Sequence, residues 1–180
     1  PDGVPEFKKL GALVIDADLV AHEVMEPDGA AFKEIVCTFG DEILTSAGLI
    51  DRKHLADVVF SKPQMLAALN RITHPAIYAE IQRRVNNSVQ QLVCLDVPLL
   101  FDSGCPLLCD ATIAVIADHE TRVERVMLRD GCTRSQVEAR MAAQMSDEEM
   151  RSRATFCIIN NGTQDDLTDE VLRIYKMVME

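Results

Sequence analysis

Four short apolar runs set the strongest limit on how this chain can fold, and they lie at residues 12–15, 92–97, 112–117 and 156–159. Each run is rich in Val, Ile, Leu or Cys and is nearly continuous, without the alternation of apolar and polar residues that marks a half-exposed strand. Continuous runs are typical of strands covered on both faces in a parallel sheet. Helical periodicity fills the gaps between the runs, and this order of elements predicts an α/β fold.

The helical stretches are interrupted where Gly or Pro breaks the pattern. We expect helices within residues 19–39, 52–89, 119–129, 133–144, 147–154 and 164–178, with breaks at 27–29, 47–48, 62–63 and 74–75. Thr133 and Ser146 are expected to cap the helices that follow them. The stretch at 52–89 is too long for a simple crossover, so part of it is expected to form a helical lobe over the sheet edge.

The chain has 180 residues, of which 48% are hydrophobic, so we expect one substantial core and one domain. A net charge of −11 without a block of Lys or Arg excludes a general nucleic-acid or membrane-surface binder, because such partners need a broad basic face.

No run approaches the roughly 18 apolar residues of a membrane span, and the first residues do not resemble a signal peptide. We therefore expect a soluble, cytoplasmic protein. Its six cysteines show no C-x-x-C pair and are expected to be reduced.

Two carboxylates, Asp16 and Asp18, follow the first apolar run directly. Because ligands bind at the carboxyl ends of the strands in such sheets, at least one of these side chains is expected there. A carboxylate at that edge can accept a proton from a substrate hydroxyl or hold a metal ion. The alternative is that Asp18 caps the helix that follows, and the spacing alone leaves both interpretations open.

Arginines are concentrated in one short region of this acidic chain, at Arg122, Arg125, Arg129, Arg134 and Arg140. The first three are spaced i, i+3 and i+7, which places them on one helix face. Guanidinium groups bind phosphate oxygens in pairs, so this pattern favours a phosphate-clamping lid. The alternative is a solvated face in which the arginines pair with Glu120, Glu124 and Glu138.

Three further features are weaker indications. His74 has no second His at metal-ligand spacing, which favours a capping or packing role over zinc binding. The turn Asn160-Asn161-Gly162 follows the last run and either closes the strand or presents amides to a purine. Cys94 and Cys105 have no His or other base nearby in sequence, so a thiol nucleophile is disfavoured.

Several motifs occur in order along the chain: V-I-D-A-D-x-x-A-x-E-V-x-x-P-x-G, I-D-R-K-x-L, L-N-R-I-T-H-P, D-V-P-L-L-F-D, R-x-x-x-R-D-G, A-R-x-x-A-Q-M and I-x-N-N-G. Together they resemble the dephospho-coenzyme A kinase family, from about Val4 to the end. The resemblance implies a P-loop kinase fold with a three-layer parallel sheet. It also implies Mg²⁺-dependent phosphoryl transfer from ATP to the ribose 3′-hydroxyl of dephospho-coenzyme A (dephospho-CoA), the last step of coenzyme A (CoA) synthesis.

The same resemblance implies roles for individual residues. Asp18 matches the family's general base, and Arg129 and Arg140 match lid arginines that neutralise charge on the transferring phosphoryl group. Arg125 matches a third lid arginine and Asn161 a turn near the adenine, whereas Arg122 lies outside the motif. The segments that border the acceptor contain Arg52, His74, Pro98, Leu99, Leu100 and Phe101. Where the family commonly has Glu after this last stretch, the chain has Asp102, which weakens a role for it.

On this basis we expect one kinase-like domain with its core at residues 1–40 and 91–180, a helical CoA-side lobe at about 41–90 and a lid at about 119–153. The family opens with an apolar strand and a phosphate loop, G-x-x-x-x-G-K-[ST], and no such motif occurs in the 180 residues. We therefore expect the first strand to be absent from the sheet, between the runs at 92–97 and 112–117, and the ATP affinity and rate of this exact chain to collapse.

Two explanations of the short N-terminus are open, a fragment of an ordinary kinase, which we favour, and a short protein that lost catalysis. The expected partners are ATP and dephospho-CoA, with no nucleic acid and no membrane. A non-catalytic module that binds CoA or dephospho-CoA is an alternative function, and a nucleoside monophosphate kinase is a third.

Overall fold

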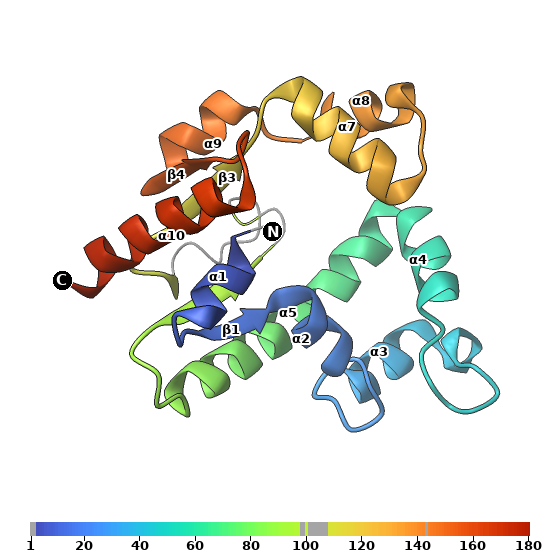
Figure 1. Ribbon diagram of the computed structural model, residues 1–180. Coiled ribbons are helices and arrows are strands. Elements are labelled where there is room, and N and C mark those ends of the chain that lie inside the picture. Colours follow the sequence, from blue (N-terminus) through green and yellow to red (C-terminus); the bar gives the residue numbers. More distant parts are fainter. Residues whose placement is uncertain (1–2, 98–99, 101–107, 143) are drawn as a thin grey trace. The chain divides into compact units, whose positions relative to one another are not determined.

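The computed structural model describes residues 3–97, 100, 108–142 and 144–180 (Figure 1). The chain divides into two compact units. The middle unit is Leu13–Pro98, and the terminal unit joins Pro1–Ala12 to Leu99–Glu180. Each unit combines helices with a pair of parallel strands, so the predicted α/β class is confirmed. Within the described ranges, no helix is both long and apolar enough to span a membrane.

The middle unit contains a parallel pair of strands, β1 (Leu13–Asp16) and β2 (Val93–Asp96), in which Leu13 lies opposite Val93 and Asp16 opposite Asp96. Between them the chain forms helical elements α2 (Ala17–Glu23), α3 (Phe32–Phe39), η1 (Asp41–Ile43), α4 (Arg52–Phe60) and α5 (Pro63–Asn86). Aliphatic side chains from the strand and the helices bury one another in its core, among them Ile15, Val20, Ile35, Ile43, Val59 and Ile81. The core holds α2, which follows the first strand, against α5.

The predicted break at residues 74–75 is wrong, because α5 continues through Pro75. Proline has no N–H, so the carbonyl of Arg71 loses its helical donor at this point. Arg71 and Pro75 are both exposed residues, so this bond is lost on the solvent-facing side of the helix. On the opposite side of the helix Ile72 and Thr73 are buried, so packing holds the segment helical despite the local cost. The other three predicted breaks do lie between helices.

The terminal unit contains a second parallel pair, β3 (Ile113–Ile116) with β4 (Phe156–Ile159), in which Ile113 lies opposite Phe156. Its helices are α1 (Val4–Lys9), α7 (His119–Asp130), α8 (Arg134–Ala142), α9 (Asp147–Arg153) and α10 (Gln164–Met179). Helix α1 lies beside α10 (Figure 1). The predicted caps are confirmed, since Thr133 Oγ1 accepts from Gln136 N at 3.4 Å and Ser146 Oγ from Glu149 N at 3.2 Å.

The four strands form two sheets of two strands, whereas the sequence led us to expect one sheet that lacks a strand between the runs at 92–97 and 112–117. Among the described strands, β2 pairs only with β1 and β3 only with β4. A strand can form ladder hydrogen bonds on both sides, so each of the four has one edge without a strand partner in the described ranges.

Candidate active site

The terminal unit has a cavity of about 950 Å³ at the carboxyl ends of β3 and β4. It is lined by Pro5, Glu6, Val115, Ile116, Ala117, Arg122, Arg125, Val126, Arg129, Asn160, Gly162, Thr163 and Gln164. These residues come from α1, the ends of both strands, one face of α7 and the start of α10. Its size suits a small-molecule ligand, and its position is where parallel α/β sheets bind ligands.

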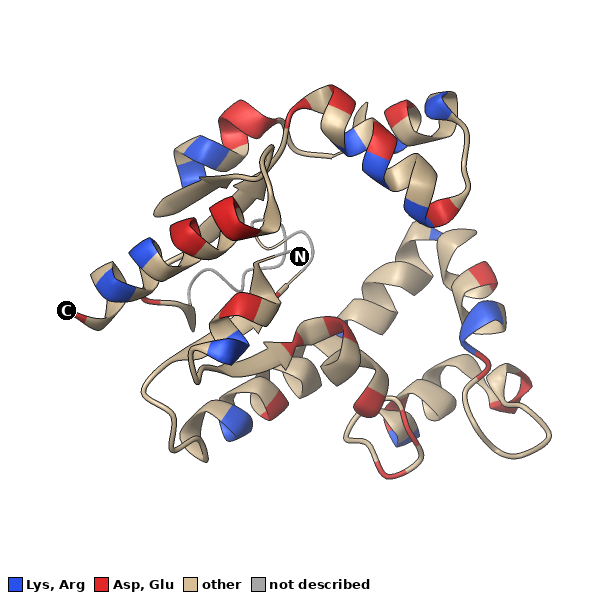
Figure 2. Ribbon diagram, in the orientation of Figure 1, with Lys and Arg blue, Asp and Glu red and all other residues tan. Residues whose placement is uncertain are grey.

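Three arginines of α7 line this cavity, as the i, i+3, i+7 spacing predicts for one helix face. Three acidic residues, Glu120, Glu124 and Asp130, also lie along α7 (Figure 2). Arg125 Nη1 donates to the carbonyl oxygen of Asn160 at 2.8 Å, which fixes the guanidinium beside the end of β4. Arg122 Nη2 donates to Asp147 Oδ2 at 2.8 Å. Arg122, which lies outside the family motif, therefore belongs to the same cavity wall as Arg125 and Arg129.

Arg134 follows the alternative interpretation of the basic region. Its guanidinium binds Glu120 through two hydrogen bonds, of 2.9 and 2.6 Å, and binds Glu138 at 2.8 Å. These contacts lower the pKa of the Glu120 carboxyl to about 2, chiefly through the hydrogen bond from Arg134. Arg134 is thus part of an ion-pair network on the surface and does not line the cavity.

Arg129 and Arg140, the arginines expected to neutralise phosphoryl charge, meet at one carboxylate. Arg129 Nε lies 2.7 Å from Asp130 Oδ1, and Arg140 Nη1 lies 3.4 Å from Asp130 Oδ2. The hydrogen bond from Arg129 holds the pKa of Asp130 below its ordinary value. The side chains of Arg129 and Arg140 are 73% and 62% exposed, so an incoming anion can reach both guanidinium groups.

The Asn160–Gly162 turn connects the two strand ends. Asn161 Oδ1 accepts a hydrogen bond of 2.7 Å from Asp118 N, which joins the end of β4 to the start of α7. This bond agrees with the interpretation that the turn closes the strand. The neighbours Asn160 and Gly162 line the cavity, and Asn161 does not.

Sequence reasoning missed Glu6 and Gln164, which also line the cavity. Glu6 is only 3% exposed, and its Oε1 accepts from Lys9 Nζ at 2.8 Å and from Gln164 Nε2 at 3.1 Å. The hydrogen bond from Lys9 lowers the pKa of Glu6, so the cavity wall carries a buried negative charge. A glutamate in a short helix gives no local sign of burial, which depends on the packing of α1 against α10.

In the middle unit, Asp16 and Asp18 have different environments. Asp16 Oδ1 accepts from the backbone N–H groups of Asp18, at 2.9 Å, and Leu19, at 3.0 Å, so Asp16 is the cap of α2. The alternative that Asp18 caps the helix is therefore wrong. Asp18 lies exposed in the first turn, and its carboxylate forms no hydrogen bond or ion pair with any residue that the structure describes.

The residues expected to border the acceptor are described only in part. Arg52 begins α4 and contacts His22 Nδ1 at 3.1 Å. His74 is exposed on α5, with its ring centroid 6.1 Å from that of Tyr78. Leu100 is half-buried. The remaining predicted residues, Pro98, Leu99 and Phe101, lie outside the described residues.

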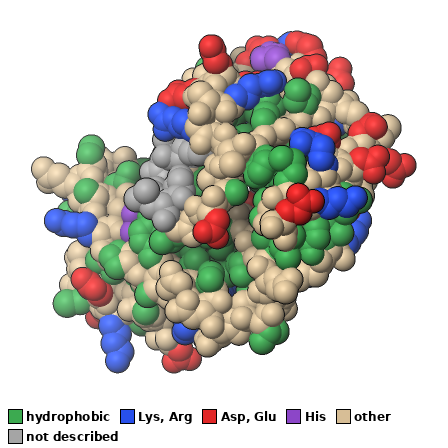
Figure 3. Space-filling model, turned by 90° about the vertical axis from the view of Figure 1, so that its left-hand side faces the viewer, with side chains coloured by type: hydrophobic (Ala, Val, Ile, Leu, Met, Phe, Trp, Pro, Cys, Tyr) green, Lys and Arg blue, Asp and Glu red, His purple; other side chains and the backbone are tan. Residues whose placement is uncertain are grey.

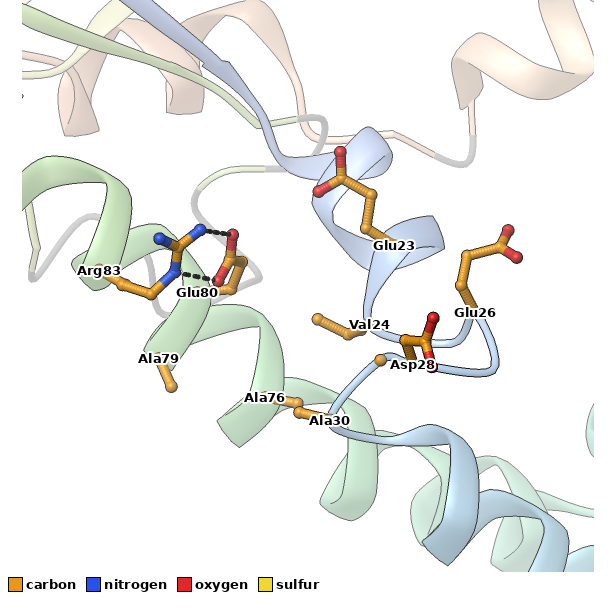
Figure 4. Close-up of a pocket in the computed structure, with 10 residues that line it drawn as sticks. Glu23, Val24, Glu26, Asp28, Ala30, Ala76, Ala79, Glu80 and Arg83 are labelled. Carbon is orange, nitrogen blue, oxygen red and sulfur yellow. Dashed lines mark hydrogen bonds and ion pairs between the residues drawn. The ribbon is translucent and has the colours of Figure 1, made fainter. Parts of the chain in front are cut away.

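A second cavity, of about 560 Å³, lies in the middle unit between the end of α2 and α5 (Figure 4). Small apolar side chains, including Ala30, Ala76 and Ala79, line it together with several acidic ones. Figure 4 shows the guanidinium of Arg83 turned toward the carboxylate of Glu80, which it binds at 2.7 Å. Arg52, His74 and Leu100, the described residues that the family resemblance assigns to the acceptor, do not line this cavity.

No metal centre is apparent in the part of the chain that the structure describes. No group of three or more His, Cys, Asp or Glu side chains there could hold a metal ion. On the face shown in Figure 3, blue and red side chains are interspersed around apolar ones.

A parallel α/β unit with an arginine-lined cavity at its strand ends defines a nucleotide-binding class of protein. The model of the dephospho-CoA kinase family matches residues 4–166. A dephospho-CoA kinase of Thermobifida fusca is 40% identical over 167 residues, which cover 92% of this chain and 84% of the relative. One from Lactobacillus johnsonii is 38% identical over 164 residues, which cover 89% of this chain and 83% of the relative.

Solved structures give the same result. The crystal structure of TT1252 from Thermus thermophilus is 34% identical and has a TM-score of 0.81, with 98% of this chain and 89% of that one covered. A dephospho-CoA kinase from Campylobacter jejuni is 26% identical, with a TM-score of 0.72, and 98% and 90% of the two chains are covered. The chain therefore belongs to the dephospho-CoA kinase family.

Proposed function

We propose that this chain carries out the ATP-dependent phosphorylation of the ribose 3′-hydroxyl of dephospho-CoA, which gives CoA. The observation that carries this proposal is the cavity lined by Arg122, Arg125 and Arg129 at the strand ends of the terminal unit, in a chain that belongs to this kinase family. Several guanidinium groups on one wall suit a ligand with several phosphate charges, such as ATP.

The nucleotide roles are assigned to the terminal unit. Arg125, fixed by the carbonyl of Asn160, is proposed to bind the nucleotide. The exposed side chains of Arg129 and Arg140 are proposed to leave Asp130 for the transferring phosphoryl group, where they neutralise charge that develops in the transition state. Asn161 is proposed to act on the adenine side by holding the turn that presents Asn160 and Gly162.

The acceptor roles are assigned to the middle unit. Asp18 is proposed as the general base that takes the proton of the 3′-hydroxyl. Because Asp16 performs the capping, the Asp18 carboxylate is available for this proton. Arg52, His74 and the segment of residues 98–101 are proposed to bind the acceptor, which carries a diphosphate that a guanidinium group can bind.

Mg²⁺ is proposed to enter with ATP as the MgATP complex. The described residues offer no cluster of carboxylates or imidazoles that fits a resident metal ion. Mg²⁺ is commonly bound by substrate phosphates, several waters and one or two protein ligands, so the triphosphate of ATP would supply several of its ligands.

The test is a coupled assay of phosphoryl transfer with dephospho-CoA, AMP, CMP and UMP as acceptors. It uses the 180-residue chain and a loop-bearing protein, in which a strand and a G-x-x-x-x-G-K-[ST] loop from a family member precede Val4. We expect the loop-bearing protein to phosphorylate dephospho-CoA in preference to the three nucleotides, and the 180-residue chain to do so at a much lower rate. Preference for a nucleoside monophosphate would contradict the proposal, and CoA binding without transfer by either protein would indicate a binding module.

A further inference from the structure

The guanidinium of Arg52 is joined to the imidazole of His22 by a contact of 3.1 Å between Nη1 and Nδ1. Arg52 is the first residue of α4, and His22 lies in the last turn of α2, so the bond joins two separate helices of the middle unit. The contact is exposed to solvent, so it is not a consequence of packing in the core. Among the residues that the structure describes, this is the one hydrogen bond that the Arg52 side chain forms.

The direction of this hydrogen bond follows from the chemistry of the two groups. A guanidinium group has five N–H donors and no acceptor, so Nδ1 of His22 must accept. An imidazole that accepts at Nδ1 is neutral and carries its proton on Nε2. The contact therefore specifies one tautomer of His22, which leaves most N–H donors of Arg52 available for another ligand.

Helix α2 places His22 next to the candidate base. Asp18 and His22 are four residues apart in Ala17–Glu23, a spacing that puts their side chains on one helix face. By binding Nδ1, Arg52 is brought to the face that carries Asp18. An unrestrained arginine samples many rotamers, and fixing one of them in advance lowers the entropic cost of binding a ligand.

We propose that His22 is a positioning residue of the acceptor site, which holds the Arg52 guanidinium ready for the diphosphate of dephospho-CoA. This inference rests on the proposed function. The two parallel N–H donors of a guanidinium match phosphate oxygens, and an orientation set by His22 makes this bidentate contact available without rearrangement. His22 itself does not touch the reacting atoms, so its loss weakens binding of the acceptor and leaves the chemical step unchanged.

The experiment compares variants of the 180-residue chain by calorimetry with dephospho-CoA. His22→Leu removes the acceptor nitrogen and keeps a good helix former. We expect its Kd for dephospho-CoA to rise about three- to tenfold, the usual effect of one lost hydrogen bond. His22→Asn has an amide oxygen close to the position of Nδ1 and should stay within about twofold of the unmodified chain. The matched control is His54→Leu, since His54 is exposed on α4 and its side chain forms no hydrogen bond or ion pair with the described residues.

A second readout does not depend on the ligand. Nitrogen-15 spectra of the four histidines report which ring nitrogen carries the proton. We expect His22 to show the Nε2–H tautomer and to lose that preference in Arg52→Gln.

Steady-state kinetics give a third readout. We expect the loop-bearing protein with His22→Leu to show a raised KM for dephospho-CoA with kcat unchanged.

The outcomes separate the two proposals. If the unmodified chain binds dephospho-CoA and His22→Leu binds equally well, the role of His22 is overturned and the proposed function stands. A His22 that remains a mixture of tautomers whether or not Arg52 is present also overturns it. If neither the unmodified chain nor the loop-bearing protein binds dephospho-CoA, the proposed function fails, and the role of His22 in the acceptor site fails with it.

Discussion

Asp16 Oδ1 accepts the backbone N–H of Asp18 at 2.9 Å, so the first of these two carboxylates caps α2 and the second is left in the exposed first turn. The two positions therefore separate stability from chemistry. Removing an N-cap of this kind usually costs about 0.5–2 kcal/mol of stability. A first-turn carboxylate contributes only about 0.3–1 kcal/mol through the helix dipole.

The pair predicts opposite results for two substitutions. Asp16→Ala is expected to lower the free energy of unfolding by about 1 kcal/mol in urea titrations. Asp18→Asn is expected to leave that free energy nearly unchanged and to reduce turnover of the loop-bearing protein by orders of magnitude, with ATP binding unaffected. Turnover that persists in Asp18→Asn would exclude Asp18 as the base.

Arg125 is predicted to contribute to ATP binding through its fixed guanidinium. In the loop-bearing protein, Arg125→Gln should weaken calorimetric ATP binding by about tenfold or more, because hydrogen bonds to charged groups are worth about 1.5–3 kcal/mol. Arg125→Lys should restore only part of this loss, since an ammonium group cannot bind phosphate in a bidentate manner. Arg151→Gln is the control, because Arg151 is exposed on α9 and its side chain forms no hydrogen bond or ion pair with the described residues. Equal losses for Arg125→Gln and Arg151→Gln would point to net charge alone.

Local sequence signals predicted the strands well. The run at 156–159 coincides with β4. The runs at 92–97 and 112–117 each extend one residue beyond β2 and β3 at both ends, and the run at 12–15 is shifted by one residue from β1. The arginine spacing also predicted the cavity face of α7. These features depend on side-chain periodicity within one element, which a sequence displays directly.

Features that depend on other elements were not predictable in this way. The helix continues past Pro75 because Ile72 and Thr73 pack on its buried side. Glu6 is buried through contacts with Gln164, which is 158 residues away. The choice between Asp16 and Asp18 as the cap depended on a difference of two residues in where the helix begins, and helix ends are the least certain part of a sequence-based assignment.

Asp130 is predicted to compete with the nucleotide for the lid arginines. Its carboxylate binds Arg129 and Arg140, and an anion that occupies these groups must leave before phosphate can bind them. Asp130→Asn should therefore tighten ATP binding by the loop-bearing protein about two- to threefold at low salt, with a smaller effect at high salt, because exposed charges are screened.

The control for Asp130→Asn is Asp169→Asn, which makes the same change in net charge at an exposed position of α10. Both measurements use calorimetry at two ionic strengths. Weaker ATP binding in Asp130→Asn would instead mean that the carboxylate orients the arginines for the ligand.

Glu80 predicts how the stability of the middle unit depends on pH. Hydrogen bonds from two arginines lower the pKa of the Glu80 carboxyl from 4.5 to about 2, and Arg83 contributes more to this shift than Arg84. A carboxyl group with a lowered folded-state pKa binds a proton more readily when unfolded, so its stabilising contribution is present above pH 4.5 and is lost as the pH falls toward 2.

Glu80→Gln should be less stable than the unmodified chain near neutral pH, with a difference that shrinks on acidification. Urea unfolding curves between pH 3 and 6, followed by circular dichroism, measure this difference. The control is Glu34→Gln, because Glu34 is exposed on α3 and its side chain forms no hydrogen bond or ion pair with the described residues. A difference between Glu80→Gln and the unmodified chain that stays constant with pH would mean that the ion pairs of Glu80 do not carry its contribution to stability.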